Sequence, residues 1–160
     1  MEATDAALVE RCAGGDEESL RELYRRYGRA VWSWCRRVLA SGRLASDATE
    51  RAFLQLWRMA GQRPVDVPVA AWMFELAQRA AGDRTPDPDL YAVWMGGQAA
   101  SQLDALPPPQ ADALRLVGLE HRSVEEAAAI LDADPADVRR DVFAGLGALA
   151  DALESQRARR

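Results

Sequence analysis

The sequence predicts an all-α protein of two small helical domains joined by a short linker. Apolar residues recur at spacings of three and four, the period of an amphipathic helix, through most of the 160 residues. Pro86 and Pro88 break this pattern near the middle of the chain, because proline removes a backbone donor and restricts the residue before it. We therefore expect one helical domain over residues 1–84, a linker with a short apolar cluster over 85–103, and a second helical domain over 104–160.

The first domain opens with two predicted helices. A short helix is expected around residues 5–13, and a long amphipathic helix over about 17–40. Trp32 falls off the apolar stripe of the long helix, so we expect it to be partly exposed. The stripe itself consists of Leu20, Leu23, Tyr24, Tyr27, Val31, Trp34, Val38 and Leu39.

Two further helices are predicted in the first domain. Asp47 and Glu50 have the spacing of a capping box, which predicts a helix that begins there and ends near Gly61. Another helix should start just after Pro68. Its apolar face consists of Trp72, Met73, Leu76, Ala77 and Ala80.

The second domain has the pattern of a helix-turn-helix preceded by a supporting helix. A proline run at 107–109 opens the supporting helix, and Ser123 with Glu126 forms a Ser-x-x-Glu capping box before a two-turn helix. Asp134 followed by Pro135 is a strong start for the last helix, which would be the one that reads a DNA groove. The predicted core face of that helix is Val138, Val142, Leu146, Leu149 and Leu153.

Two glycines interrupt the last predicted helix. Gly145 and Gly147 each cost about 1 kcal/mol relative to alanine in a helix interior. The sequence therefore indicates either a close approach by a neighbouring helix or fraying at this point.

Composition indicates a globular chain with a buried core. Hydrophobic residues make up 49% and charged residues 28% of the sequence. No apolar run approaches the roughly 20 residues that a membrane span requires. The first residues lack the basic and apolar segments of a signal peptide, so we expect a cytoplasmic protein.

Few residue types suited to metal binding or catalysis are present. Cys12 and Cys35 are the only cysteines and His121 is the only histidine, so a four-ligand structural zinc site cannot be assembled. No phosphate-binding glycine loop, nucleophile elbow or helical metal motif is found. We expect no catalytic residues, no metal and no cofactor, and we expect the protein not to be an enzyme; the cysteines should be buried.

Charge is distributed unevenly along the chain. Residues 1–85 hold 13 Arg and 12 acidic residues, whereas residues 86–160 hold 7 Arg and 13 acidic residues. Residues 104–154 have a balance of −7. Because phosphate neutralisation supplies most non-specific DNA affinity, this balance disfavours autonomous DNA binding by the second domain.

The ordered motifs resemble those of the ECF-type (extracytoplasmic function) sigma factors, the small two-domain promoter-recognition subunits of bacterial RNA polymerase. The similarity runs from the segments around Leu8 and 23–27, through 45–57 and 71–84, to the helix-turn-helix at 123–138. It implies a region-two-like helical bundle followed by a region-four-like helix-turn-helix domain. The implied function is transcription initiation, with core RNA polymerase and promoter DNA as partners.

The resemblance also implies roles for particular residues. The segment at 45–58 would grip the polymerase, and the helix at 72–84 would read and melt the promoter. The implied polymerase-binding residues are Asp47, Glu50, Arg51, Leu54, Gln55, Trp57 and Arg58. The implied promoter-binding residues are Trp72, Glu75, Arg79 and Arg84, and those for the upstream element are Ser123, Asp137, Arg139 and Arg140.

The chain departs from the family pattern at several of these positions. Glu50 and Arg51 stand where the family usually has Gln and then Glu, and Arg79 stands where Asn is usual. Asp141 and Ala144 occupy positions where the family normally has Arg, on a face that we expect to be exposed.

A second hypothesis for the function remains open beside that of a sigma factor. The chain would then be a degenerate sigma-like adaptor whose acidic second domain binds an anti-sigma factor or another protein.

The arginines on one side of the long first-domain helix also allow two interpretations. A solvated basic face is the ordinary role of charge on the outside of an amphipathic helix, and DNA or polymerase contact is the alternative. The arginines at helical spacing are Arg21, Arg25, Arg29 and Arg36, flanked by Arg26 and Arg37.

Overall fold

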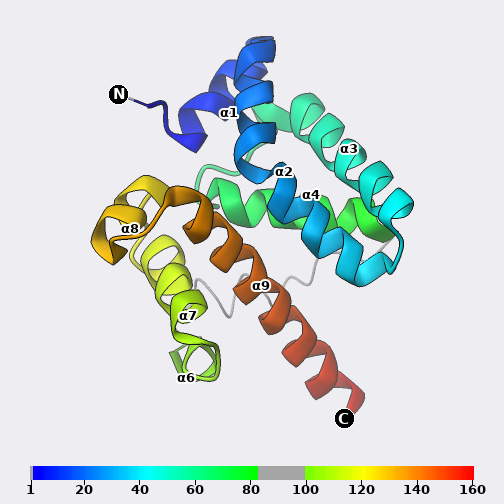
Figure 1. Cartoon of the computed structure of the whole chain (residues 1–160), viewed down its shortest axis with the longest axis vertical. Coiled ribbons are helices and arrows are strands. Elements are labelled where there is room, and N and C mark those ends of the chain that lie inside the picture. The colour runs from blue at the N-terminus through cyan, green and yellow to red at the C-terminus, as the bar shows by residue number, and fades with distance from the viewer. Residues whose placement is uncertain (1, 83–99) are drawn as a thin grey trace. The chain divides into compact units, whose positions relative to one another are not determined.

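The computed structural model describes residues 2–82 and 100–160. The chain divides into two compact units, Met1–Thr85 and Pro86–Arg160, and each is described by itself. The described residues form helices and connecting loops with no strand, so the all-α prediction is confirmed (Figure 1). The predicted apolar cluster of the linker lies outside the described residues.

The first unit is a bundle of four α-helices with one 3₁₀ turn. Its elements are α1 (Asp5–Ala13), α2 (Glu17–Leu39), α3 (Gly42–Met59), η1 (Ala60–Gln62) and α4 (Val69–Gly82). α2 packs on α1 and α3, and α4 packs on both α2 and α3 (Figure 1). The helices predicted around 5–13, at 17–40 and after Pro68 are confirmed.

α3 begins earlier than the sequence predicts. Ser41 is its N-cap, with the Ser41 hydroxyl accepting from the Leu44 amide at 3.3 Å. Asp47 lies inside the helix and forms an ion pair with Arg43 at 3.6 Å, one turn away. The predicted capping box at Asp47 is therefore wrong, because the serine at the end of the preceding loop caps the helix first.

The core of the first unit combines large side chains of α2 with small side chains of α3. Ala45, Ala48 and Ala52 of α3 are fully buried, which lets the neighbouring helix backbones approach closely. Aromatic pairs join the helices at two further points: Tyr24 with Phe53 at 4.7 Å, and Trp34 with Phe74 at 5.1 Å between ring centroids. The buried side chains that α2 contributes include Leu23, Tyr27, Val31 and Cys35.

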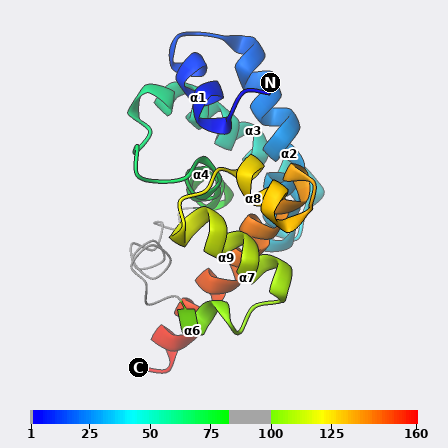
Figure 2. The same cartoon turned by 90° about the vertical axis from the view of Figure 1, so that its left-hand side faces the viewer.

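The second unit contains the predicted helix-turn-helix. Its elements are α6 (Ala100–Leu103), α7 (Pro108–Leu114), the π-helical turn η2 (Arg115–Leu119), α8 (Val124–Leu131) and α9 (Pro135–Ala158). α6 falls inside the stretch 85–103 predicted as linker. Figure 2 shows α7 alongside α9, against which it packs.

The helix starts in the second unit follow the sequence prediction. The Ser123 hydroxyl accepts from the Glu126 amide at 3.0 Å, and the Glu126 carboxylate accepts from the Ser123 amide at 3.2 Å. Asp134 caps α9 by accepting from the Ala136 amide at 2.8 Å. Both capping predictions are confirmed, as is the buried face of α9: Val138, Val142, Leu146, Leu149 and Leu153.

Gly145 of α9 lies at a close approach to α7. A Cβ atom at Gly145 would lie 2.7 Å from Leu114 Cδ1 and 3.1 Å from Leu114 Cγ. Close approach by a neighbouring helix, one of the two predicted reasons for this glycine, is therefore confirmed.

No helix within residues 2–82 and 100–160 has the length and apolar character to cross a membrane. Cys12 and Cys35 are buried free thiols, as predicted. Burial raises the pKa of each thiol to about 11, so both stay protonated at neutral pH.

Candidate functional site

The exposed side of α3 carries several of the residues to which the family resemblance assigns polymerase binding. Asp47, Glu50, Leu54 and Arg58 are all exposed and follow one another at three or four residues, so they share one face of the helix. Leu54 is 53% exposed and is the apolar member of this set. We call these four residues the α3 face.

The other three residues assigned to this segment lie beside the α3 face. Gln55 and Trp57 are half-buried, and the Gln55 Oε1 atom is buried without a hydrogen-bond partner. Arg51 is exposed along its side chain, yet its guanidinium donates to the Ala80 carbonyl of α4 at 2.9 Å. The α3 face thus has an apolar centre at Leu54 with charged residues around it.

α4, the helix expected to read the promoter, is buried along nearly its whole length. Trp72 is only 3% exposed and belongs to the core. Glu75 and Arg79 form an ion pair at 2.6 Å, and the Arg79 side chain is 43% exposed. Arg84 lies outside the described residues, so Arg79 is the most accessible of the described residues assigned to promoter DNA.

The basic side of α2 is less extensive than its arginine spacing predicts. Arg21 pairs with Glu17 and Glu18, and Arg25 with Glu22 at 2.6 Å. On α2, the exposed arginines for which the described residues provide no ion pair are Arg29, Arg36 and Arg37.

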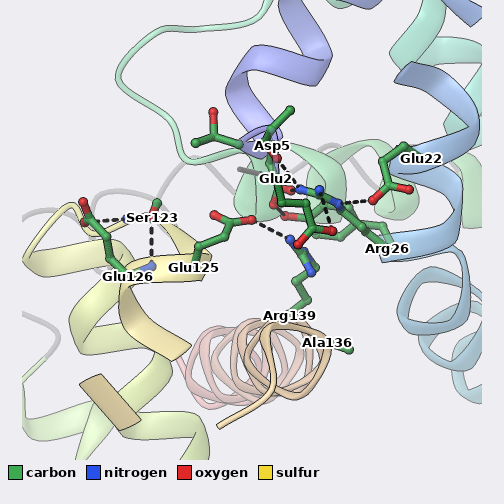
Figure 3. Close-up of polar contacts among 12 residues, drawn as sticks. Glu2, Asp5, Glu22, Arg26, Ser123, Glu125, Glu126, Ala136 and Arg139 are labelled. Atoms are coloured by element: carbon green, nitrogen blue, oxygen red, sulfur yellow. Dashed lines mark hydrogen bonds and ion pairs between the residues drawn. The ribbon is translucent and has the colours of Figure 1, made fainter. Parts of the chain in front are cut away.

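Arg26 is the arginine of α2 that the structure places in the interior. Its side chain is 2% exposed and contacts Asp5 at 2.8 Å and Glu22 at 2.6 Å, with a further hydrogen bond to the Ala3 carbonyl (Figure 3). Tyr27 also donates to Asp5. Burial works to lower the pKa of Arg26, but the hydrogen bonds to Asp5 and Glu22 outweigh it and raise that pKa. Arg26 therefore fastens α1 to α2 and is not part of a solvated face.

Glu22 is strongly held in its charged form by the same cluster. Hydrogen bonds from Arg25 and then Arg26 lower the pKa of Glu22 to about 2, against a smaller opposing effect of burial. The carboxylate stays ionised throughout the physiological pH range.

The start of α9 offers little free positive charge. Arg139 is 4% exposed and donates to Glu125 of α8 at 2.8 Å (Figure 3). Arg140 is exposed and pairs with Asp137 at 2.9 Å and with Asp141 at 3.4 Å. Both arginines assigned to the upstream element are therefore engaged with acidic residues of their own unit.

The expected exposure of the Asp141 and Ala144 face is wrong. The Asp141 side chain is 18% exposed, and Ala144 is half-buried. Burial raises the pKa of Asp141 despite the neighbouring Arg140. Exposed positions beside the turn of the helix-turn-helix include Ala133, Asp134 and Ala136.

Comparison with known proteins finds similarity to bacterial sigma factors. The sigma-70 region 2 family matches residues 23–85, which contain most of α2 and all of α3 and α4. The ECF RNA polymerase sigma-E factor of Escherichia coli (strain K12) is 27% identical over 171 residues, covering 88% of this chain and 89% of that protein. The chain resembles the ECF sigma factors over most of its length.

Two further proteins are similar to this chain. The ECF RNA polymerase sigma factor SigK of Mycobacterium sp. (strain KMS) is 26% identical over 140 residues, covering 87% of this chain and 72% of that protein. A solved structure of CnrH in complex with the cytosolic domain of CnrY is 21% identical, covers 94% of this chain and 97% of that chain, and has a TM-score of 0.46.

Three contacts of this protein have no signal in the sequence. Arg26 with Asp5, Arg139 with Glu125, and Arg51 with the Ala80 carbonyl each join residues from different helices. Because arginine is usually a surface residue, its position on a helix does not reveal a buried partner that lies many residues away.

Proposed function

We propose that this protein is an ECF sigma factor that binds core RNA polymerase through the α3 face and engages promoter DNA with its first unit. The observation that carries the proposal is the exposed Leu54 among Asp47, Glu50 and Arg58 within the matched sigma-70 region 2. An apolar residue surrounded by charged ones is the usual anatomy of a protein interface. The work of such a factor is recognition, so the proposed role is non-enzymatic and is carried out in the cytoplasm.

Binding of core polymerase by the intact chain tests this proposal. We expect Leu54→Asp to weaken binding at least about tenfold, because it places a charge at the centre of the interface. Val65→Asp is the matched control, since Val65 is 85% exposed in the loop before α4 and lies off the α3 face. Failure of the unmodified chain to bind at low salt, where charge contacts are strongest, would overturn the proposal.

The second unit favours a restricted version of this function. Arg139 and Arg140 are paired with Glu125 and Asp137, and the exposed turn before α9 carries Asp132 and Asp134. We propose that this unit has little DNA affinity of its own and contributes through protein contacts, as in the adaptor reading. This version would be contradicted if the unmodified chain bound duplex DNA strongly and with a steep salt dependence, and if Arg140→Gln reduced that binding.

A further inference from the structure

Arg51 links the α3 face to the end of α4. It projects from α3 between Glu50 and Leu54 in the sequence, and its Nη2 atom donates to the Ala80 carbonyl at 2.9 Å. Ala80 lies in the last turn of α4, which ends at Gly82. The contact therefore joins two helices across 29 residues of chain.

The Ala80 carbonyl belongs to the last turn of α4. The last four carbonyls of an α-helix have no acceptor role within the helix, and satisfying one of them stabilises the final turn. A guanidinium at this end also complements the partial negative charge of the helix C-terminus. Arg51 supplies both effects from a neighbouring helix.

Arg51 also lies within electrostatic reach of α2. Burial raises the pKa of Cys35, whereas a hydrogen bond with Thr49 and the charge of Arg51 act in the opposite direction. Arg51 thus lies where α2, α3 and α4 approach one another. A substitution of Arg51 would affect all three helices.

We infer that Arg51 is a positioning residue that fixes the C-terminal end of α4 relative to α3, and that promoter engagement by this protein depends on it. The inference rests on the proposed function and refines one part of it. Arg51 would act within the first unit, while Asp47, Glu50, Leu54 and Arg58 contact the polymerase.

The first test is amide hydrogen exchange of the intact chain. We expect Arg51→Gln to speed exchange of the Ala80–Gly82 amides roughly tenfold, the effect of losing one charge-assisted hydrogen bond. Arg51→Lys should restore most of the protection, because an ammonium can donate to the same carbonyl. Arg58→Gln is the matched control, with the same change of charge on an exposed residue of the same helix. Unchanged exchange at 80–82 in Arg51→Gln would overturn the capping role.

The second test separates polymerase binding from DNA engagement. Core polymerase is combined with each variant and mixed with a library of DNA duplexes that have a randomised central segment. The fraction of the library that this complex retains is compared with the fraction that core polymerase alone retains. We expect Arg51→Gln to keep core affinity within about twofold while DNA retention falls roughly tenfold. Arg51→Lys should recover retention, and Arg58→Gln should lose core affinity.

The remaining outcomes each decide a different question. Equal loss of core affinity in Arg51→Gln and Arg58→Gln would make Arg51 an interface contact and overturn the inference. Parallel losses of core affinity, DNA retention and thermal stability would assign Arg51 a merely structural role and would also overturn it. If the unmodified chain fails to bind core polymerase, the proposed function fails and the promoter part of the inference fails with it, while the exchange experiment still decides the cap.

Discussion

Arg139 of α9 and Glu125 of α8 form an ion pair of 2.8 Å inside the helix-turn-helix, and the Arg139 side chain is only 5% exposed. The basic residue expected to meet phosphate instead holds the two helices together. Breaking a buried pair by removing one partner is costly, so this arginine cannot turn outward without destabilising the unit. The positive charge available to DNA at the start of α9 is consequently small.

Adding exposed charge beside the turn should create DNA affinity. Ala133 and Ala136 are exposed, unlike Asp141 and Ala144, so Ala133→Arg with Ala136→Arg leaves the core and the Asp134 side-chain cap intact. We expect the intact double variant to bind duplex DNA more tightly at low salt, with the log–log salt slope steeper by up to about 2. Binding is measured by fluorescence anisotropy across a salt series.

A charge-matched variant controls for general attraction. Ala105→Arg with Ala152→Arg adds the same charge at exposed positions away from the turn. An equal gain in the control would show that net charge alone governs DNA binding. No gain in either variant would show that the geometry of the helix-turn-helix prevents binding.

Removing Arg26 should destabilise the first unit strongly. Arg26→Met takes a buried charge away from Asp5, whose carboxylate is 7% exposed. We expect a loss of about 3–5 kcal/mol in the free energy of unfolding by urea. Arg29→Met, on the exposed side of the same helix, should change it by less than about 0.5 kcal/mol. Similar small effects of both substitutions would refute the structural role of Arg26.

Acid should weaken the same cluster through Glu22. The folded-state pKa of Glu22 is about 2, below its ordinary value of 4.5. The contribution of this carboxylate to the stability of the folded state is therefore complete above pH 4.5 and is lost as the pH falls through 2. We expect Glu22→Gln to lower the melting temperature at pH 7, and the difference from the unmodified protein to disappear near pH 2. Melting curves recorded between these pH values check this, and a constant difference would contradict it.

A methyl group at Gly145 should disturb the contact between α7 and α9. The new Cβ would lie 2.7 Å from Leu114 Cδ1, and Leu114 is fully buried and has little room to move. We expect overpacking to cost about 1–3 kcal/mol, partly offset by the roughly 1 kcal/mol better helix propensity of alanine. Gly42→Ala is the control, because a Cβ there meets nothing within 4 Å. Equal gains in melting temperature from both substitutions would argue against the close approach.

Glycine at position 40 should stabilise the protein. Ala40 ends α2 with φ of 53°, a left-handed conformation that costs a residue with a Cβ about 1 kcal/mol. Ala40→Gly should therefore raise the melting temperature, while Ala30→Gly in the interior of the same helix should lower it. A decrease in both variants would contradict the assignment of strain to Ala40.

Local signals carried most of what could be predicted from the sequence. Ser123 with Glu126, and Asp134 with Pro135, act within one helical turn, so their spacing alone locates the helix starts. The same signal failed at Asp47, because an acidic pair three residues apart also occurs inside helices.

The candidate site also combines features that the sequence predicts with features that it does not reveal. The α3 face follows from helical spacing, which the sequence displays directly. The acceptor of Arg51 is a backbone carbonyl 29 residues away, and a carbonyl has no side-chain identity by which a sequence could reveal it.

The attachment of α1 to α2 has a consequence for the order of folding. α1 is nine residues long, below the length at which an isolated helix persists in water, whereas α2 has 23 residues. Asp5 is separated in sequence from Arg26 by 21 residues and from Tyr27 by 22, so these contacts require a loop of that length to close. We therefore expect α1 to form late, by docking on an α2 that is already helical. Leu8→Ala in α1 should then speed unfolding and leave the folding rate nearly unchanged, and a slowed folding rate would place α1 in the nucleus instead.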